Sequence, residues 1–269
     1  MYPYLLPAIF EYTVPMYDLF IGIGIVLMLL YIAKRLENHD GYSRKQTNKI
    51  LILVAMSLLI ALGSSYLFDG IFHSIQEGEL TFGSITFIGG LIGGLSSFWL
   101  LLKYAYKDDN KNMKQIMNTI IVGVVLAHAF GRIGCYFAGC CYGIPTESFL
   151  GVVFPYGHAH TAFPGIALFP TQLFEAAFLF ALFIVLNVVK KVENKEVEVY
   201  LLGYGLWRIL LEFIRGDDRG SFFPFISTQY NQFPTPSQYL SLLMILFGLY
   251  LYFKPTIANR LTKSDKKVQ

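Results

Sequence analysis

Residues 14–33 read VPMYDLFIGIGIVLMLLYIA, and residues 34–49 continue with KRLENHDGYSRKQTNK. An apolar stretch of about 20 residues is the length that one α-helix needs to cross the hydrocarbon core of a bilayer. A dense basic segment directly after such a stretch is typical of the end that stays on the cytoplasmic side. This pair of segments therefore predicts a membrane-spanning helix whose C-terminal end faces the cytoplasm.

The rest of the chain repeats this alternation of apolar runs and polar segments. Of its 269 residues, 55% are hydrophobic and 14% are charged, a composition typical of a polytopic membrane protein. Charged segments delimit seven apolar runs, at 14–33, 50–68, 82–102, 116–130, 171–189, 199–214 and 238–253. We therefore predict an all-α fold with seven transmembrane helices, forming a single transmembrane domain over residues 1–269.

The distribution of basic residues predicts which loops face the cytoplasm. Of the 21 lysines and arginines, 17 lie in four segments, at 34–49, 103–114, 190–198 and 254–269. The positive-inside rule makes these segments cytoplasmic. The N-terminus is then outside and the basic tail 254–269 is cytoplasmic, with outward loops at 135–169 and 215–237. The net charge of +3 follows from this topology and indicates no nucleic-acid partner.

The first apolar run is predicted to remain in the mature protein. It has no basic segment before it and no small-residue cleavage site after it, so it does not read as a signal peptide.

The basic residues outside the four cytoplasmic segments are all arginines: Arg132, Arg208, Arg215 and Arg219. A guanidinium group binds phosphate or carboxylate at two points and keeps its charge when desolvated, which lysine does less well. A charge inside a membrane segment is costly and marks a site with a partner. That partner is either a carboxylate, as in Arg132 with Glu175 or Arg208 with Glu212, or an external anion.

The predicted helix over 199–214 carries a charged face. Arg208, Glu212 and Arg215 follow each other at i, i+4 and i+7, so they would share one face of this helix. If that face met only Glu212, it would hold an excess of positive charge. A phospholipid phosphate, or a transported anion, would complete the balance. Arg219, in the RGDDRG segment at 215–220, is interpreted as a solvated loop charge.

Residues 131–143, GRIGCYFAGCCYG, contain every cysteine of the chain: Cys135, Cys140 and Cys141. Four interpretations are open for them. They are buried packing residues, or two of them form a disulfide such as Cys135 to Cys140, or one is a reactive thiolate beside Arg132. The fourth is a metal site shared with His128, His158 or His160. The C-x₄-C-C spacing matches no recognised set of metal ligands, which argues against this fourth interpretation.

Residues 89–94 read GGLIGG and indicate a close helix contact. Gly89 and Gly90 lie one turn before Gly93 and Gly94, a spacing that allows a neighbouring helix to approach closely. The same glycines could leave backbone amides open to a ligand head group.

Three motifs, in order along the chain, resemble those of the phosphatidylglycerol–prolipoprotein diacylglyceryl transferase family of bacterial inner membranes. GRIG at 131–134 opens like the family signature G-R-x-G-N-F-x-N-x-E-x-x-G, which Gly143 closes. FPTQLFE at 169–175 is similar to H-P-S-Q-L-Y-E, and YGLWRILLEFIR at 204–215 is similar to Y-G-x-x-R-x-x-x-E-F-x-R. The resemblance covers most of the chain. It implies a multi-pass protein of the bacterial plasma membrane with its active site toward the outer leaflet.

The resemblance also implies a reaction and the residues for it. The donor is phosphatidylglycerol in the membrane, the acceptor is a prolipoprotein cysteine thiol at the outer face, and glycerol 1-phosphate leaves. No metal and no organic cofactor is implied. Arg132 and Arg208 would hold the lipid phosphate, with Glu212 beside them in the catalytic set. The remaining residues implied to bind substrate are Tyr17, Gly143, Gln172, Glu175, Tyr204 and Arg215. Gly89 and Gly90 are added as substrate-binding candidates because of their open backbone amides, not because of the resemblance.

The sequence departs from the family pattern on the acceptor side. TFIGG at 86–90 places Ile88 where the family has a histidine thought to take the proton of the acceptor thiol. Within the signature, Cys135, Ala138 and Cys140 replace the family's Asn, Asn and Glu. Candidate catalytic replacements are Cys135, Cys140 and His128, which lies one turn before Arg132 on the same helical face; the His-Ala-His loop at 158–160 is a further candidate for the base.

Two other functions remain compatible with this sequence. One is a related transferase that uses the same donor with another acceptor, such as a glycan hydroxyl. The other is a non-enzymatic protein that binds or transports phospholipid, although the chain shows neither an internal repeat nor a pair of interrupted helices.

Overall fold

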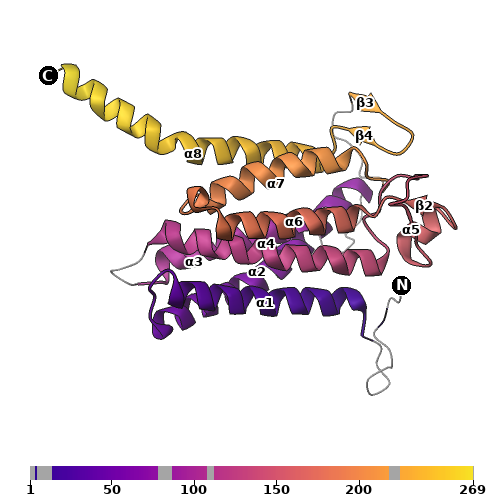
Figure 1. Ribbon diagram of the computed structural model, residues 1–269, viewed down its shortest axis with the longest axis horizontal. Coiled ribbons are helices and arrows are strands. Elements are labelled where there is room, and N and C mark those ends of the chain that lie inside the picture. The colour runs from indigo at the N-terminus through magenta and orange to yellow at the C-terminus, as the bar shows by residue number, and fades with distance from the viewer. Residues whose placement is uncertain (1–3, 5–13, 78–86, 108–111, 218–224, 269) are drawn as a thin grey trace. The chain divides into compact units, whose positions relative to one another are not determined.

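The computed structural model describes residues 4, 14–77, 87–107, 112–217 and 225–268, and within them the chain is mostly helical (Figure 1). The helices are α1 (Met16–Asn38), α2 (Arg44–Glu77), α3 (Phe87–Tyr104), α4 (Met113–Ala138), α5 (Gly157–Ala162), α6 (Thr171–Val188), η1 (Lys190–Val192), α7 (Glu196–Glu212) and α8 (Pro236–Val268). The strands are β1 (Val152–Val153), β2 (Ala167–Leu168), β3 (Ile226–Ser227) and β4 (Gln232–Phe233).

Five helices of the described chain are long and apolar enough to cross a membrane. They are α1, residues 44–68 of α2, α4, α6 and residues 236–254 of α8. α3 and α7 occupy the two remaining predicted runs, and α7 is only 17 residues long. The prediction of an all-α polytopic membrane protein is therefore confirmed, and the count of seven spans stays a prediction.

Several helices continue beyond the apolar run that predicted them. α1 ends at Asn38 instead of residue 33, and α4 ends at Ala138 instead of residue 130. For α1 the reason is that Lys34, Arg35 and Glu37 form helices well, so they end a membrane span without ending the helix. Because α4 is longer, Arg132 and Cys135 lie on a helix and the turn begins only after Ala138.

α7 ends before the sequence predicted, at Glu212. The two residues that follow form a turn, and Arg215 makes an isolated β-bridge with Gly143. The prediction that Arg215 shares a helical face with Arg208 and Glu212 is therefore wrong, because the helix does not reach it.

The chain divides into two compact units, one of residues 29–119 and one of residues 1–28 with 120–269. In the unit of residues 29–119, α2 packs along α3. A Cβ atom added at Gly94 would lie 3.0 Å from the Ala61 Cβ, and Ser64 Oγ donates to the Gly89 carbonyl at 3.0 Å. The predicted close helix contact of the glycine motif is therefore confirmed.

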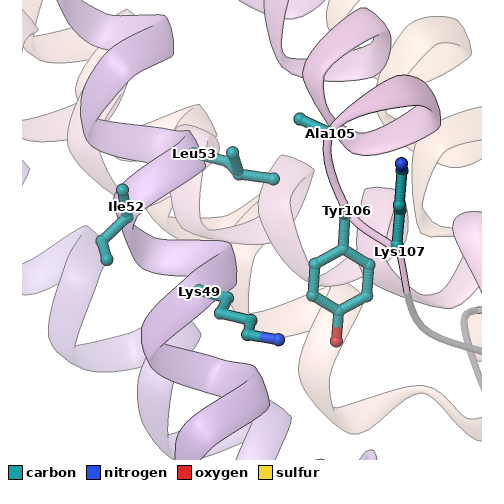
Figure 2. A pocket seen from close by; sticks show the side chains of 6 residues that line it. All are labelled: Lys49, Ile52, Leu53, Ala105, Tyr106 and Lys107. Carbon is teal, nitrogen blue, oxygen red and sulfur yellow. The ribbon is translucent and has the colours of Figure 1, made fainter.

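The same unit contains a pocket beside the ends of α2 and α3 (Figure 2). Its lining residues are Lys49, Ile52, Leu53, Ala105, Tyr106 and Lys107. None of the site residues predicted from the sequence lines this pocket.

In the other unit, small residues bring the helices together. A Cβ atom at Gly24 of α1 would lie 2.9 Å from the Ala127 carbonyl oxygen of α4. A Cβ atom at Gly205 of α7 would lie 3.0 Å from the Ser241 carbonyl oxygen of α8. α7 also packs against α6. These contacts bring polar side chains of α4, α6, α7 and α8 within reach of one another.

The segment between α4 and α6 folds over the end of these helices. β1 and β2 pair antiparallel, with Val152 opposite Leu168. The Gly143 amide donates to the Phe169 carbonyl at 2.9 Å, and the Ile144 amide donates to the Ile214 carbonyl at 3.0 Å. The chain after α4, the start of α6 and the chain after α7 are thereby joined through their backbones.

Candidate functional site

The site is built around Glu175 of α6, whose side chain is fully buried. The Tyr204 hydroxyl donates to Glu175 Oε1 at 2.7 Å. Arg132 Nε lies 3.1 Å from Glu175 Oε2, and Arg208 Nη1 lies 3.7 Å from the same oxygen. A buried carboxylate is tolerated only with such partners, because desolvation of an unpaired charge is costly. Glu175 therefore ties α4, α6 and α7 together.

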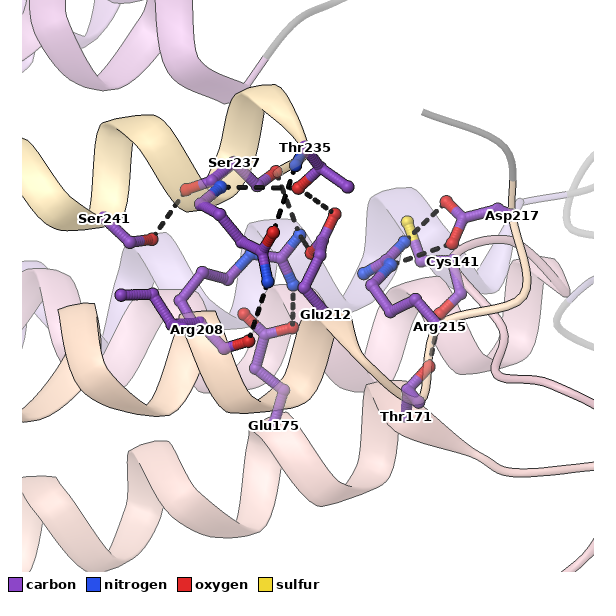
Figure 3. Close-up of polar contacts among 12 residues, drawn as sticks. Cys141, Thr171, Glu175, Arg208, Glu212, Arg215, Asp217, Thr235, Ser237 and Ser241 are labelled. Carbon is purple, nitrogen blue, oxygen red and sulfur yellow. Dashed lines mark hydrogen bonds and ion pairs between the residues drawn. The ribbon is translucent and has the colours of Figure 1, made fainter. Parts of the chain in front are cut away.

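Arg208 also contacts a second carboxylate and the start of α8 (Figure 3). Its Nη2 lies 2.8 Å from Glu212 Oε2 and donates to Ser237 Oγ at 3.3 Å. Glu212 Oε1 accepts a hydrogen bond from Thr235 Oγ1 at 3.0 Å. The guanidinium of Arg208 therefore sits between two carboxylates, and the start of α8 closes the network.

The charges in this network balance. Among the described residues, Arg132 and Arg208 contribute two positive charges, while Glu175 and Glu212 contribute two negative charges. The sequence predicted an excess of positive charge only if the face of Arg208 met Glu212 alone. That condition is not met, because Glu175 supplies a second carboxylate from a neighbouring helix. A bound anion is not needed to neutralise the site and would have to be recognised by free hydrogen-bond donors instead.

Arg132 supplies such donors. Its Nε contacts Glu175 and donates to His128 Nε2 at 3.3 Å. Its two Nη groups make no hydrogen bond or ion pair with any residue that the structure describes, and the side chain keeps 11% exposure. The guanidinium group of Arg132 is thus held in place through Nε. Its two Nη groups, which can bind a phosphate at two points, are left open.

His128 belongs to the same network. Its Nε2 accepts from Arg132 and is therefore unprotonated, and its ring meets Tyr204 edge to face with centroids 5.2 Å apart. The role of His128 as a base stays a prediction. His158 and His160 lie on α5, where His160 Nδ1 is 3.0 Å from the Phe154 carbonyl oxygen.

Arg215 forms a separate ion pair. It is 1% exposed, and its Nε and Nη2 donate to the two carboxylate oxygens of Asp217 at 2.8 and 2.6 Å (Figure 3). Burial alone would lower the pKa of Arg215, but the Asp217 carboxylate keeps this pKa well above its usual value. Asn231 Nδ2 donates to the Arg215 carbonyl at 2.7 Å. Arg215 is therefore a fixed cation outside the Glu175 network.

The two adjacent cysteines form a turn that α6 holds by its backbone. Gln172 Nε2 donates to the Cys140 carbonyl at 2.5 Å, and Thr171 Oγ1 donates to the Cys141 carbonyl at 2.7 Å. None of the three cysteines, all of which the structure describes, forms a disulfide bond. Hydrogen bonds from Cys135 and Cys140, together with nearby guanidinium groups, hold the pKa of the Cys141 thiol well below its usual value. Hydrogen bonds with Cys135 and Cys141 raise the pKa of the Cys140 thiol, so of the two thiols in the turn only Cys141 has a lowered pKa.

The remaining predicted substrate-binding residues fall in different places. Gly143 lies where three backbone segments meet, and a Cβ atom there would lie 2.7 Å from Phe169 Cβ. Tyr17, at the start of α1, is within electrostatic reach of Arg132 and the cysteines. Gly89 and Gly90 belong to the other compact unit, in contact with α2. Close packing explains why residue 143 is a glycine. That Tyr17, Gly89, Gly90 and Gly143 contact the substrate stays a prediction.

Thr171, Thr235 and Ser237 are polar site residues that our sequence analysis missed. For Thr235 a signal was present, because TPSQ at 235–238 has the spacing of a capping box with proline at the first helical position. The Thr235 amide donates to Gln238 Oε1 at 3.0 Å, and the Gln238 amide donates to Thr235 Oγ1 at 3.4 Å. This cap fixes the start of α8, where Thr235 also reaches Glu212.

Comparison with known proteins gives a consistent assignment. Residues 3–254 match the sequence profile of the prolipoprotein diacylglyceryl transferase family. The chain is 31% identical to phosphatidylglycerol–prolipoprotein diacylglyceryl transferase 2 of Clostridium perfringens (strain 13 / Type A), over 97% of this chain and 98% of that protein. It is 30% identical to the phosphatidylglycerol–prolipoprotein diacylglyceryl transferase of Clostridium tetani, over 88% and 91% of the two chains. The enzyme of that name from Dehalococcoides mccartyi (strain 195) is 26% identical, over 77% and 79%.

The matched region contains all three sequence motifs and every residue of the Glu175 network. The likeness to the two clostridial enzymes extends over nearly the whole length of both partners. The chain belongs to the prolipoprotein diacylglyceryl transferase family.

Proposed function

We propose that this protein transfers the diacylglyceryl group of phosphatidylglycerol to the cysteine thiol of a prolipoprotein. In this reaction the sulfur forms a bond to the glycerol carbon that carries the phosphate. The bond between that carbon and the phosphate oxygen breaks, and the electron pair leaves with glycerol 1-phosphate. The printed names of the relatives, phosphatidylglycerol–prolipoprotein diacylglyceryl transferases, support this assignment.

One observation carries the proposal at the level of the site: Arg132 is anchored by Glu175 and keeps its Nη groups uncommitted among the described residues. A phosphate diester offers two oxygens to such a fork. As the carbon–oxygen bond breaks, negative charge grows on the leaving phosphate. Fixed donors that meet this charge in a water-poor site lower the barrier without reorganisation.

Arg208 and Tyr204 then act mainly as positioning residues. Arg208 divides its contacts between Glu175 and Glu212, and Tyr204 donates to Glu175. Both keep the carboxylate that orients Arg132 in place. Arg208 also adds positive potential at the phosphate site.

The proposed setting is the bacterial plasma membrane, crossed by seven helices with the N-terminus outside and the C-terminus in the cytoplasm. The positive-inside distribution of 17 basic residues supports this orientation. The Arg132 end of α4 then faces the outer leaflet, where phosphatidylglycerol and the acceptor would enter.

A second candidate function is transfer to another acceptor, such as a glycan hydroxyl. Ile88 in place of the family's histidine, and cysteines in place of an asparagine and a glutamate of the signature, favour it. These changes affect the acceptor side and leave the motifs that hold Arg132, Glu175 and Arg208.

The test is product analysis with the purified full-length protein. Phosphatidylglycerol labelled separately in its acyl chains and in its head-group glycerol is incubated with a cysteine lipobox peptide, with the matched serine peptide, or with a glycan. We expect acyl label on the cysteine peptide alone and one glycerol phosphate released for each peptide modified. Label on the glycan would support the second candidate. Release of no phosphate ester with any acceptor would contradict both and leave a lipid-binding or transport protein.

A further inference from the structure

The three cysteines gather into one cluster at the end of α4. Cys135 lies in the last turn of the helix, and Cys140 and Cys141 lie in the turn that follows. Their Sγ atoms all lie within 4.8 Å of one another. Among the His, Cys, Asp and Glu residues that the structure describes, no other group of three comes together in this way. The linear spacing concealed this arrangement, because the chain reverses between the first cysteine and the other two.

The backbone of the turn is built to hold this arrangement. Gly139 adopts φ +65° and Cys141 adopts φ +62°, so the chain reverses after the helix. The Cys140 amide donates to the Cys135 carbonyl at 3.3 Å. A residue with a Cβ atom in the left-handed region is strained by roughly 1–2 kcal/mol, and glycine or asparagine would fit there more easily. A cysteine at position 141 is therefore better explained by its side chain than by its backbone.

The start of α6 fixes the turn from outside. Gln172 and Thr171 hold the carbonyl groups of Cys140 and Cys141 at 2.5 and 2.7 Å. The sulfur atoms take no part in these anchoring bonds. The three sulfur atoms lie close to one another, and Cys140 Sγ also lies 3.6 Å from the Cys135 carbonyl oxygen.

Two buried cations lie beside the cluster. Arg215 is next to Cys141 (Figure 3), and Arg132 is one helical turn before Cys135. Three thiolates around a divalent ion carry a net charge of −1. The two guanidinium groups, although each is also paired with a carboxylate, add positive potential beside these sulfurs. The cluster is therefore suited to an anionic metal–thiolate complex.

The spacing of the sulfur atoms fits one metal ion. Zinc binds thiolates at about 2.3 Å, so two sulfurs of a tetrahedral site lie roughly 3.8 Å apart. Sulfur atoms already within 4.8 Å reach this separation by small side-chain rotations. Structural zinc sites use four protein ligands, whereas catalytic sites use three and leave the fourth position open. Three cysteines correspond to the second type.

We propose that Cys135, Cys140 and Cys141 bind one thiophilic divalent metal ion of the zinc type, and that the fourth coordination position receives the acceptor thiol. The identity of this fourth ligand rests on the proposed function, whereas the three-cysteine site does not.

A metal ion bound by the three cysteines would make unnecessary the base that the family's histidine provides and that Ile88 cannot. A thiol that coordinates zinc gives up its proton to solvent, so no side chain has to act as the base. The sulfur then forms the bond to the glycerol carbon as the carbon–oxygen bond to phosphate breaks. The electron pair of that bond leaves with glycerol 1-phosphate beside Arg132. The product is an uncharged thioether, which binds the metal less strongly than a thiolate and is free to exchange.

Metal binding can be measured without activity. Full-length protein, purified in detergent under reducing conditions, is titrated with Zn²⁺ in competition with a chromophoric chelator, and separately with Co²⁺. We expect about one ion per chain and a thiolate-to-cobalt charge-transfer band. Each single variant, Cys135→Ser, Cys140→Ser and Cys141→Ser, should weaken binding by at least about 100-fold, more than loss of an outer-shell partner costs. Unfolding curves confirm that the variants are folded.

A second measurement separates the site from its use. Adding the cysteine lipobox peptide to the Co²⁺ protein should change the charge-transfer band, and the matched serine peptide should not. Unaltered Zn²⁺ binding in the triple Cys→Ser variant, or no binding by the reduced protein, would overturn the metal site. Zn²⁺ binding with no response to the cysteine peptide would overturn only the fourth ligand. Failure of the proposed transferase function would appear separately, as the absence of product with an intact metal titration.

Discussion

Arg132 Nε lies 3.1 Å from Glu175 Oε2, and this contact, together with the hydrogen bond to His128, orients a guanidinium whose outer nitrogens stay uncommitted among the described residues. The carboxylate is fully buried and is itself held by Tyr204 and Arg208. An arginine fixed in this way loses little further freedom when it binds a phosphate. The ion pair therefore prepares the site for its anion and does not merely neutralise a charge in the membrane.

The first prediction concerns the shape of the two site cations. Arg132→Lys and Arg208→Lys keep the charge but remove the planar fork, so we expect each to lower the transfer rate by about 100-fold or more. The measurement is the initial rate of glycerol phosphate release. Arg219→Lys is the matched control, because Arg219 is predicted to be a solvated loop charge, and its rate should stay near normal. Near-normal rates in both site variants would rule out the phosphate clamp.

The second prediction concerns stability. Glu175→Gln keeps the size of the side chain but leaves Arg132 without its buried carboxylate and Arg208 with only Glu212. Breaking a buried ion pair by removing one partner costs about 3–5 kcal/mol, which a thermal unfolding curve in detergent detects. Glu147→Gln, at an exposed position, is the control and should unfold like the parent protein. An unchanged unfolding temperature for Glu175→Gln would mean that the network contributes no stability.

The third prediction compares two glycines of the same signature motif. A Cβ atom at Gly143 would lie 2.7–2.8 Å from Phe169 and from the Ile214 carbonyl, so Gly143→Ala should destabilise the protein by about 1–3 kcal/mol. At Gly131, within α4, a Cβ atom would meet nothing within 4 Å. Gly131→Ala should therefore stabilise the helix by roughly 0.5–1 kcal/mol. Opposite signs in the unfolding temperatures are the expected result; equal destabilisation would contradict the packing role of Gly143.

The fourth prediction concerns topology. A reporter fused after Gln269 should be cytoplasmic, and one inserted near Gly157 should be external, because four basic segments hold 17 of the 21 lysines and arginines. Paired fusions that are active on opposite sides of the membrane provide the measurement. If both reporters lie on one side, the seven-span topology is incorrect.

The fifth prediction concerns the missing histidine. A positioned base is typically worth about 10²- to 10⁴-fold, so a site that merely lost its base should gain thiol transfer from Ile88→His. If the cysteine cluster has taken over, Ile88→His adds little, whereas Cys135→Ser and Cys140→Ser each lower transfer at least about tenfold with phosphatidylglycerol binding intact. We expect this second pattern. A large gain from Ile88→His, or full activity and normal thermal stability in the triple Cys→Ser variant, would favour packing cysteines.

Composition and charge pattern predicted the membrane class and placed a helix in each apolar run, because the bilayer constrains span length and polarity strongly. Helix ends were less predictable. Polar helix formers at 34–38 continue α1 beyond its apolar run, so hydropathy does not locate its last turn. α4 continues through 131–138, GRIGCYFA, where the glycines and Arg132 had suggested an end to the run. α7 ends before Arg215, so Arg215 does not share a helical face with Arg208. Arg215 pairs instead with the backbone of Gly143, a contact between residues far apart in the sequence that local patterns do not predict.

The sequence predicted most residues of the site and two of its ion pairs, but not how these pairs are joined. Arg132 with Glu175 and Arg208 with Glu212 were foreseen as possible pairs, but the sharing of Glu175 by both arginines depends on how three helices pack. The gathering of three sulfurs depends on a reversal at Gly139 that linear spacing does not reveal. Thr235 could have been found, since its capping motif is local.

The grip of α6 on the carbonyl groups of Cys140 and Cys141 has a practical consequence for every experiment on these residues. Thr171 and Gln172 recognise peptide oxygens, which any amino acid at positions 140 and 141 would present. The conformation of the turn is thus held by contacts to its backbone, and replacing the sulfur atoms should leave that conformation unchanged. A property that is lost when Cys140 or Cys141 becomes serine can therefore be ascribed to sulfur chemistry and not to a change in the backbone of the turn.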